Sequence, residues 1–426
     1  MARCRSSRDR AGTIGGWRLP FALSLAAASL LPSAARAATV QFWFPTWNAA
    51  VQAWLQETAI PSFEAEHPGV NIEVVLGSWS DYENKLLVAF AAGTFPDVYL
   101  IPAEGPRRHA RQGWATPLDP YLSRWGETAD YLPVALAAAR VDGRQYGLPW
   151  SIQGASLILR KSVALEAGLD DVVPATWDAF RVAAQRMTQI EGGTVSRVGY
   201  QMPWDQPFMN WVHAAGGELF SSDFRRAVID SPPAEAALSY LVGLRQLVQP
   251  SGMPVARLDF AAGTVGMREA EPTYLGTLRL SSPDVIDDIA VGVTPRGERH
   301  AVRVYVPNLA IGSQSRQKDL AWAWLAYLQR PDNLLTYNAL FGRLSPRRSH
   351  LQATYLDELP PLRDFLNVYA MHGIPHVWPA ASSFAYMRQP LREQLAAALA
   401  GDVSPRQALA EVARAWQVEL DKSEQP

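Results

Sequence analysis

Cysteine is almost absent from this chain of 426 residues, which contains only Cys4. A single cysteine can form neither an internal disulfide bond nor a cysteine-rich zinc site, so neither of these stabilises the fold. A strong excess of basic charge is missing as well, because the formal net charge is −2. Proteins dedicated to nucleic acids usually present a basic face, and we therefore expect no nucleic-acid partner.

The signature motifs of several enzyme classes are also missing. The sequence has no Walker-A phosphate loop, no glycine-rich dinucleotide fingerprint, no HExxH zinc motif and no GxSxG nucleophile motif. His372 and His376 are four residues apart, but Gly373 and Pro375 between them disfavour the regular helix that would align the two rings. We expect no catalytic residue, no bound metal and no cofactor.

The first 37 residues have the pattern of a secretory signal peptide. Five arginines accompany one acid before an apolar stretch from Leu19 to Leu31, which is too short to span a bilayer. Ala35 and Ala37 are the small residues that a signal peptidase requires, so we predict cleavage after Ala37; an uncleaved membrane anchor is the alternative. Cleavage would remove Cys4 and leave 33 basic and 40 acidic side chains, a net charge of −7. We expect a soluble protein in the periplasm.

Strand and helix patterns alternate after the signal peptide. Residues 40–44, 71–76 and 97–101 are β-rich, and amphipathic helical patterns that begin at Asn48 and Trp79 lie between them. Strands connected in this way are parallel and joined by right-handed crossovers. The same alternation starts again after residue 150 without a flexible linker, which predicts an α/β protein with two lobes.

The second half of the chain contains clear helix starts and further strand patterns. Thr176 precedes a helical pattern as an N-cap, and Ser231-Pro232 opens another helix. In the last helix, Ser404 and Gln407 form a capping box around Pro405. Strands are predicted over 155–159, 289–293 and 302–311.

Tryptophan is abundant, with 15 in the chain. In an open parallel sheet, ligands bind beyond the carboxyl ends of the strands. Thr46, Trp47 and Asn48 follow the first predicted strand, Trp79 follows the second and Glu104 follows the third. Indole plates among hydrogen-bonding groups suit a sugar, which has an apolar C–H face and a rim of hydroxyls. We therefore predict a carbohydrate site at this edge.

Several segments resemble motifs of one family and occur in the same order. They are residues 63–70 (FEAEHPGV), 92–98 (AGTFPDV), 142–149 (DGRQYGLP), 167–178 (AGLDDVVPATWD) and 260–267 (FAAGTVGM). Over nearly its full mature length, the chain is similar to the extracellular solute-binding proteins of family 1, the carbohydrate-binding group of ABC importers that includes maltodextrin-binding protein.

This resemblance implies a type II periplasmic-binding-protein fold, in which two lobes, each a mostly parallel sheet flanked by helices, are joined by three hinge crossings. With crossings near 151, 292 and 342, lobe one would be 38–150 with 293–342, and lobe two 151–292 with 343–426. The ligand would be trapped between the lobes. The implied partners are the ABC permease subunits with their ATPase, and the implied state is a monomer without enzymatic activity.

Further ligand contacts are implied by the same resemblance. On lobe two they are Trp150, Gln153, Trp204, Gln206, Tyr274, Trp378 and Tyr386. Two departures from the family pattern affect this set. In the first, Asn308 follows Val306-Pro307 at a position where many members have a glycine pair. In the second, the segment from Glu271 to Tyr274 stands where a tryptophan is expected, so Tyr274 or Glu271 would take the place of that tryptophan.

Two other functions stay open at this point. The same transport role with glycerol-3-phosphate or a glycerophosphodiester would need cationic donors, which Arg343, Arg347 and Arg348 offer. A more remote alternative is an exported glycoside-active enzyme, which would need two carboxylates at a defined separation that sequence cannot reveal.

Overall fold

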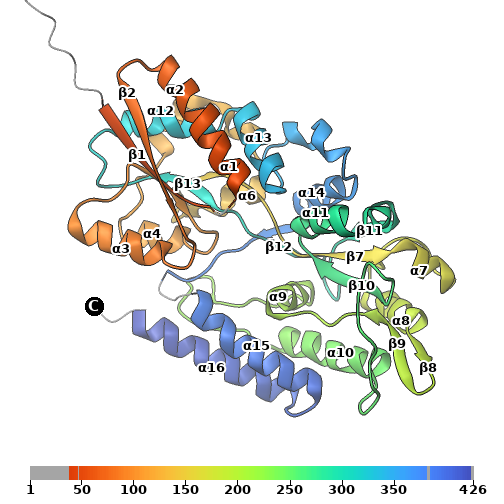
Figure 1. Ribbon diagram of the computed structural model, residues 1–426. Coiled ribbons are helices and arrows are strands. Elements are labelled where there is room, and N and C mark those ends of the chain that lie inside the picture. The colour runs from red at the N-terminus through yellow and green to blue at the C-terminus, as the bar shows by residue number, and fades with distance from the viewer. Residues whose placement is uncertain (1–37, 47, 381–383, 424–426) are drawn as a thin grey trace, which may run out of the picture. The chain divides into compact units, whose positions relative to one another are not determined.

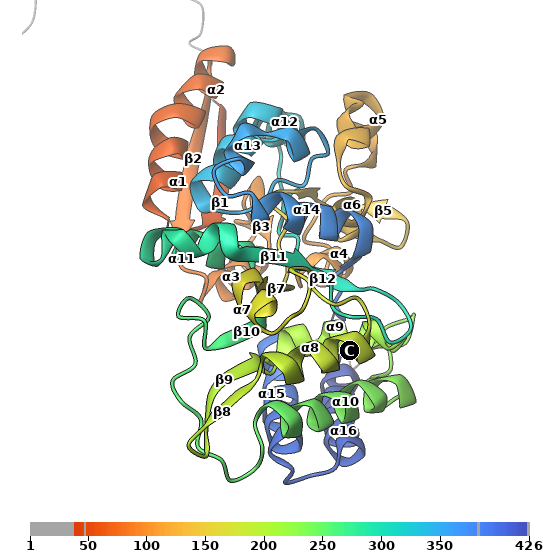
Figure 2. The same ribbon diagram turned by 90° about the vertical axis from the view of Figure 1, so that its right-hand side faces the viewer.

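The computed structural model describes residues 38–46, 48–380 and 384–423, so the predicted signal peptide and Trp47 lie outside the described residues. Residues Ala38–Pro426 form a single unit that is built on two five-stranded sheets (Figure 1). Each sheet has its own set of helices, and Figure 2 gives the second view of them.

The first sheet has the strand order β2-β1-β3-β13-β6. Its strands are β1 (Ala38–Pro45), β2 (Val70–Gly77), β3 (Val98–Ile101), β6 (Leu148–Pro149) and β13 (Asn308–Ile311). As predicted, β1 runs parallel to β2 and β3. Along β1, Val40, Phe42 and Phe44 are buried on one face, the period of two that a strand imposes.

The helices of the first sheet come from two stretches of the chain. They are α1 (Ala49–Trp54), α2 (Ile60–Glu66), α3 (Tyr82–Ala92), α4 (Pro106–Arg111), α5 (Asp119–Trp125), α6 (Pro133–Ala137), α12 (Lys318–Leu328) and α13 (Pro331–Phe341). A π-helical turn, Leu55–Ala59, joins α1 to α2. It ends two residues before Pro61, which has no N–H to continue an α-helical ladder.

The second sheet has the order β11-β7-β10-β9-β8. Its strands are β7 (Ser156–Arg160), β8 (Gln189–Glu191), β9 (Thr194–Tyr200), β10 (Val265–Ala270) and β11 (Ile289–Gly292). The later helices are α7 (Lys161–Glu166), α8 (Trp177–Met187), α9 (Asp205–Ala214), α10 (Pro232–Val248), α11 (Pro272–Ser281), α14 (Pro361–His372), α15 (Phe384–Ala400) and α16 (Pro405–Ser423).

Both sheets are more mixed than the expected parallel pattern. In the first sheet β13 runs antiparallel to β3 and β6, and in the second β7 runs antiparallel to β10 and β11, while β9 and β10 are parallel. The βαβ rule fixes direction only where a helix returns the chain to the same edge. Strands such as β13 arrive from the other sheet, so that rule does not apply to them.

The chain passes between the sheets after β6, and returns between β11 and β13. The single strand expected over 302–311 is two strands, β12 (Val302–Val304) and β13, because Pro307 in the interval cannot donate to a ladder. β12 pairs in parallel with β14 (Gly373–Pro375).

At Gly154, an added Cβ would lie 2.5 Å from the carbonyl oxygen of Arg303, so the two segments that pass between the sheets require glycine there. The lobe boundaries stay a prediction.

Helix starts agree well with the sequence signals. Asn48 Oδ1 accepts a hydrogen bond from the N–H of Val51, and Thr176 Oγ1 accepts one from the N–H of Ala179. Ser404 Oγ accepts from the N–H of Gln407, whose side-chain oxygen accepts from the N–H of Ser404 at 3.2 Å. The predicted capping box of α16 is confirmed.

Replacing Ser404 with alanine removes one half of this capping box. We expect Ser404→Ala to lower the free energy of unfolding by about 1 kcal/mol, because an N–H at the start of α16 loses its acceptor. Ser404→Thr keeps the hydroxyl and should restore most of the loss. Urea denaturation of both variants tests this, and equal losses in the two would contradict a role for the hydroxyl.

Candidate functional site

A cavity of ≈ 440 Å³ lies where the ends of the two sheets meet the passing segments. Its walls combine aromatic, carboxylate, amide and guanidinium groups. The lining residues are Trp79, Pro102, Ala103, Glu104, Gln153, Gln206, Glu271, Tyr305, Pro307, Arg343 and Arg388. Aromatic surface with a few polar groups is the usual composition of a small-molecule site.

Strand ends place most of these side chains. Trp79 follows β2 by two residues and Glu104 follows β3 by three, so both lie beyond the carboxyl edge of the first sheet. Glu271 directly follows β10 of the second sheet, and Gln206 is the second residue of α9. The cavity is therefore formed by residues from both sheets, which is the arrangement a ligand needs in order to hold the two together.

Aromatic rings are fixed on two sides of the cavity. Trp79 is half-buried, and its ring meets that of Tyr82 edge-on at 6.3 Å. The Tyr82 hydroxyl donates to the carbonyl of Trp43 and accepts from the N–H of Leu100, both at 3.1 Å, which anchors the pair to the sheet. Tyr305 pairs with Gln153 through backbone hydrogen bonds between the passing segments.

Two carboxylates in the cavity are partly withdrawn from water. Burial raises the pKa of Glu104, and burial also raises the pKa of Glu271 although Arg343 and Arg388 act in the opposite direction. Within the described part of the chain, neither carboxylate has an ion-pair partner within 4.0 Å. Both are therefore strong acceptors available to hydroxyl groups of a ligand.

The two arginines of the cavity differ in how they are held. Arg388 makes a two-pronged contact with Asp205, with Nε donating at 2.5 Å and Nη2 at 3.1 Å. Arg343 is buried, its guanidinium lies 3.8 Å from the centre of the Phe341 ring, and Nη1 donates to the Tyr337 hydroxyl at 3.4 Å. Arg388 is thus neutralised, whereas Arg343 brings a positive charge to the wall.

Four of the predicted site residues line the cavity together: Trp79, Glu104, Gln153 and Gln206. The rule that ligands bind beyond strand ends led to the first two, and the family resemblance to the others. Their role in binding stays a prediction.

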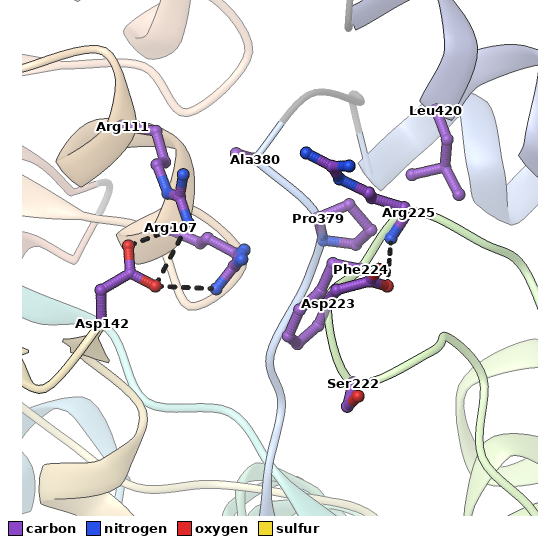
Figure 3. A pocket seen from close by; sticks show the side chains of 10 residues that line it. All are labelled: Arg107, Arg111, Asp142, Ser222, Asp223, Phe224, Arg225, Pro379, Ala380 and Leu420. Carbon is purple, nitrogen blue, oxygen red and sulfur yellow. Dashed lines mark hydrogen bonds and ion pairs between the residues drawn. The ribbon is translucent and has the colours of Figure 1, made fainter.

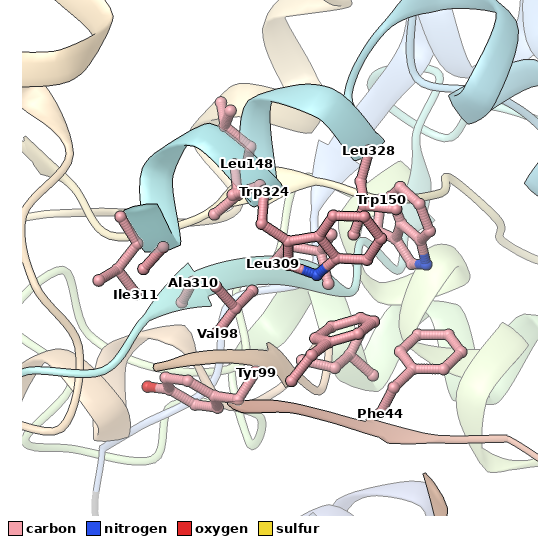
Figure 4. Close-up of a cluster of buried hydrophobic side chains, with 14 of the residues drawn as sticks. Phe44, Val98, Tyr99, Leu148, Trp150, Leu309, Ala310, Ile311, Trp324 and Leu328 are labelled. Carbon is pink, nitrogen blue, oxygen red and sulfur yellow. The ribbon is translucent and has the colours of Figure 1, made fainter. Parts of the chain in front are cut away.

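Other predicted contacts lie in the hydrophobic cores. Trp150 is buried and stacks on Tyr337 at 4.2 Å (Figure 4 shows it beside Phe44 and Leu328). Trp378 packs against Phe220 and Trp416. These indoles fill space between helices and strands, so here they do not line the cavity.

The remaining predicted residues lie outside the cavity lining. Asn308 is buried in β13, where its Nδ2 donates to the carbonyl of Val306 at 2.6 Å. Thr46 and Asn48 are engaged at the start of α1, where Thr46 Oγ1 accepts from the N–H of Asn48. Trp204 is the N-cap residue of α9 and is half-buried. Tyr274 lies under the Arg268 guanidinium, and Tyr386 is 71% exposed.

Two members of the lining, Tyr305 and Arg388, have no signal in the sequence that predicts a binding role. Tyr305 lies in a stretch that reads as one continuous strand, and Arg388 lies inside a helix among other polar residues. Arg388 reaches the cavity through its contact with Asp205, 183 residues earlier in the chain. The sequence suggests Arg343 only as a phosphate ligand and Glu271 only as a substitute for a missing tryptophan.

A second cavity, of ≈ 560 Å³, is shown in Figure 3. Arg107 and Arg111 contact Asp142 there, at 4.0 and 2.9 Å. Arg107 also covers the ring of Phe224 at 4.4 Å, and Phe224 has a φ of 64°, which is rare for a bulky residue. The guanidinium covers one face of this ring, so the first cavity, with Trp79, is the better candidate for the predicted carbohydrate site.

Residues 38–46, 48–380 and 384–423, which the structure describes, bear on two other kinds of site. No group of three or more His, Cys, Asp or Glu side chains there could hold a metal ion. Nor is any helix in those ranges both long enough and apolar enough to cross a membrane.

Solved structures share the fold. The sugar-binding protein MalE from Xanthomonas citri aligns with a TM-score of 0.78 over 90% of this chain and 98% of its own, at 23% identity. The chain has the two-lobe type II periplasmic-binding-protein fold, and the predicted fold class is confirmed.

Sequence relatives include a protein of Brucella abortus (strain 2308) whose name describes it as a binding protein. It is 25% identical over 310 residues, which are 71% of this chain and 74% of the relative. A maltotriose-binding protein of Pyrococcus abyssi (strain GE5 / Orsay) is 21% identical over 63% of this chain and 58% of its own length. The profile described as "Bacterial extracellular solute-binding protein" matches residues 44–334. The chain therefore belongs to the bacterial extracellular solute-binding protein family.

Proposed function

We propose that this chain is the periplasmic substrate-binding component of an ABC importer and captures a sugar or oligosaccharide in the cavity of ≈ 440 Å³. The observation that carries the proposal is the combination of the Trp79 plate with the carboxylates of Glu104 and Glu271, which follow strands of two different sheets. The names of the relatives, which include maltotriose-binding and sugar-binding proteins, support the same ligand class.

Each wall would contribute a different part of recognition. Trp79 would stack against the apolar face of a sugar ring, while Glu104 and Glu271 would accept hydrogen bonds from hydroxyls. Gln153 and Gln206 offer both donors and acceptors. Because the ligand would contact both sheets at once, it would stabilise the closed arrangement of the lobes over the open one. The closed monomer would then dock on the membrane permease, which takes the sugar.

A phosphorylated ligand fits this cavity less well. Arg343 could pair with a phosphate, but Glu104 and Glu271 would repel it. We propose binding without chemical turnover, so the sugar would leave the protein unchanged.

The first experiment is a calorimetric panel with the protein freed of residues 1–37. Maltose, maltotriose, diacetylchitobiose, glucose and glycerol-3-phosphate serve as probes, and chromatography of each sugar after incubation reports turnover. A sugar at 100 times its dissociation constant should stabilise the fold by about 2.7 kcal/mol. Binding of glycerol-3-phosphate alone would overturn the sugar assignment, and product release would overturn the assignment as a binding protein.

We expect the affinity for the sugar to fall on acidification. The folded pKa values of Glu104 and Glu271 are raised by burial, so protonation begins above the ordinary glutamate value of about 4.3. Charge-assisted hydrogen bonds to the ligand are present above these raised pKa values and lost below them.

Calorimetry at a series of pH values measures the effect. The double variant Glu104→Gln and Glu271→Gln should bind more weakly at neutral pH and show little dependence on pH. An unchanged pH profile in that variant would show that other groups cause the dependence.

A further inference from the structure

A third cavity, of ≈ 350 Å³, has a mainly apolar wall and is lined in part by Arg303 of β12 and by Ile374 and Pro375 of β14. Its lining consists of His213, Glu218, Leu219, Phe220, Ser221, Ser222, Phe224, Arg303, Ile374, Pro375 and Val377. Its size is in the range of small-molecule sites. Rings separate it from the carbohydrate cavity, because Tyr305 meets His376 at 4.4 Å and His376 stacks on Trp378 at 5.4 Å.

The feature that distinguishes this cavity is Arg303. Its side chain is only 2% exposed, and among the residues that the structure describes no carboxylate lies within 4.0 Å of its guanidinium. Its neighbours are the sulfur of Met209, which Nη1 contacts, and the Trp378 ring at 5.7 Å. Neither of these carries a negative charge.

A buried cation without a counterion is costly, by several kcal/mol even after relaxation of the surroundings. Burial lowers the pKa of Arg303 to about 10, so the guanidinium still carries its charge at neutral pH. The protein therefore maintains a positive charge beside a mainly apolar cavity. Such an arrangement is unusual unless an anion pairs with the guanidinium when the protein functions.

The other charged groups of the cavity are already paired. Glu218 lies 2.6 Å from Arg299 and 3.4 Å from His213, and it is largely exposed. Burial lowers the pKa of His213, so this ring is neutral at pH 7. Glu218 therefore forms its ion pair with Arg299, and at a distance beyond 4.0 Å its charge offsets that of Arg303 only in part.

We propose that this cavity is a second ligand site, which takes a small amphipathic anion with a carboxylate on an apolar body. The carboxylate would pair with Arg303, and the apolar body would lie against Leu219, Phe220 and Ile374. Apolar burial and a charge-assisted hydrogen bond would then act on the same molecule. The proposal does not depend on the identity of the ligand in the carbohydrate cavity.

Benzoate and benzyl alcohol are suitable probes, because they share the apolar ring and differ in charge. In calorimetry at constant ionic strength, the wild-type protein should bind benzoate at least about tenfold more tightly than benzyl alcohol. Arg303→Met should abolish this preference, and Arg303→Lys, which keeps a cation, should retain part of it. Arg303→Met removes an unpaired buried charge, so it should not lower the melting temperature.

A second variant locates the probe. Leu219→Trp fills the cavity and should weaken both probes, whereas Trp79→Ala, in the other cavity, should weaken neither. Equal affinities for the two probes, a preference that survives in Arg303→Met, or no binding of benzoate at millimolar concentration would each overturn the proposal. Loss of benzoate binding in Trp79→Ala would place the probe in the carbohydrate cavity and overturn it as well.

Discussion

Trp79→Ala should weaken sugar binding about thirtyfold, a loss of about 2 kcal/mol, because it removes the aromatic plate at the end of β2. Aromatic residues that pack against a ligand in a desolvated pocket commonly account for losses of this size. Trp79→Phe keeps a smaller aromatic ring at this position and should lose less affinity for the sugar than Trp79→Ala. Titration followed by calorimetry gives the affinity, with the sugar identified by the panel above.

Trp125→Ala provides the matched control. Trp125 is also half-buried and on the first lobe, but it packs on Trp322 at 5.7 Å, away from the cavity. We expect this variant to lose stability and keep its affinity, whereas Trp79→Ala should keep most of its stability and lose affinity. If both variants bind sugar as the wild type does, the site assignment at the end of β2 is wrong.

Glu269→Gln should stabilise the protein at alkaline pH, by as much as about 3 kcal/mol at pH 8. Glu269 is buried, and its Oε1 accepts from the Tyr200 hydroxyl at 2.6 Å and from Trp211 Nε1 at 2.9 Å. Its Oε2 is buried without a hydrogen-bond partner among the described residues. Burial consequently raises the pKa of Glu269 from 4.5 to about 7.

The direction of the effect follows from linkage. A carboxyl whose pKa is higher in the folded state binds more protons there, so its contribution to stability is complete below pH 4.5 and is lost as the pH rises through about 7. The uncharged amide of the Glu269→Gln variant cannot lose a proton, so this decline should disappear. Urea denaturation at pH 5 and pH 8 measures it, and the exposed Glu57→Gln serves as control. Equal declines in wild type and Glu269→Gln would contradict the assignment.

Local signals in the sequence were sufficient for much of the fold. Asn48, Thr176 and Ser404 each cap a helix where their short polar side chains predicted it, because capping depends only on residues within one turn. The first three strands are parallel because helical crossovers connect them: α1, the π-helical turn and α2 between β1 and β2, and α3 between β2 and β3.

From the residue pattern alone, the candidate site could be predicted only where strand direction determines it, whereas Gln153 and Gln206 are implied by the family resemblance. Trp79 and Glu104 follow strands whose parallel direction is predicted by the alternation of strand and helix patterns, and both residues line the cavity. Whether Trp150 or Trp378 would face a ligand or a core depended on Tyr337 and Trp416, which lie far along the chain. A tryptophan in a core and one in a cavity have the same local sequence pattern, so periodicity does not separate them.

The place of β13 in the first sheet has a consequence for biosynthesis. β13 lies between β3 and β6, yet its residues 308–311 are made some 160 positions after those of β6, Leu148–Pro149. The first sheet cannot be completed until β13 has left the ribosome, and pairing of such distant segments is slow. About three quarters of the described chain is therefore synthesised before the first sheet can be completed, so its other strands wait for a partner that is made late.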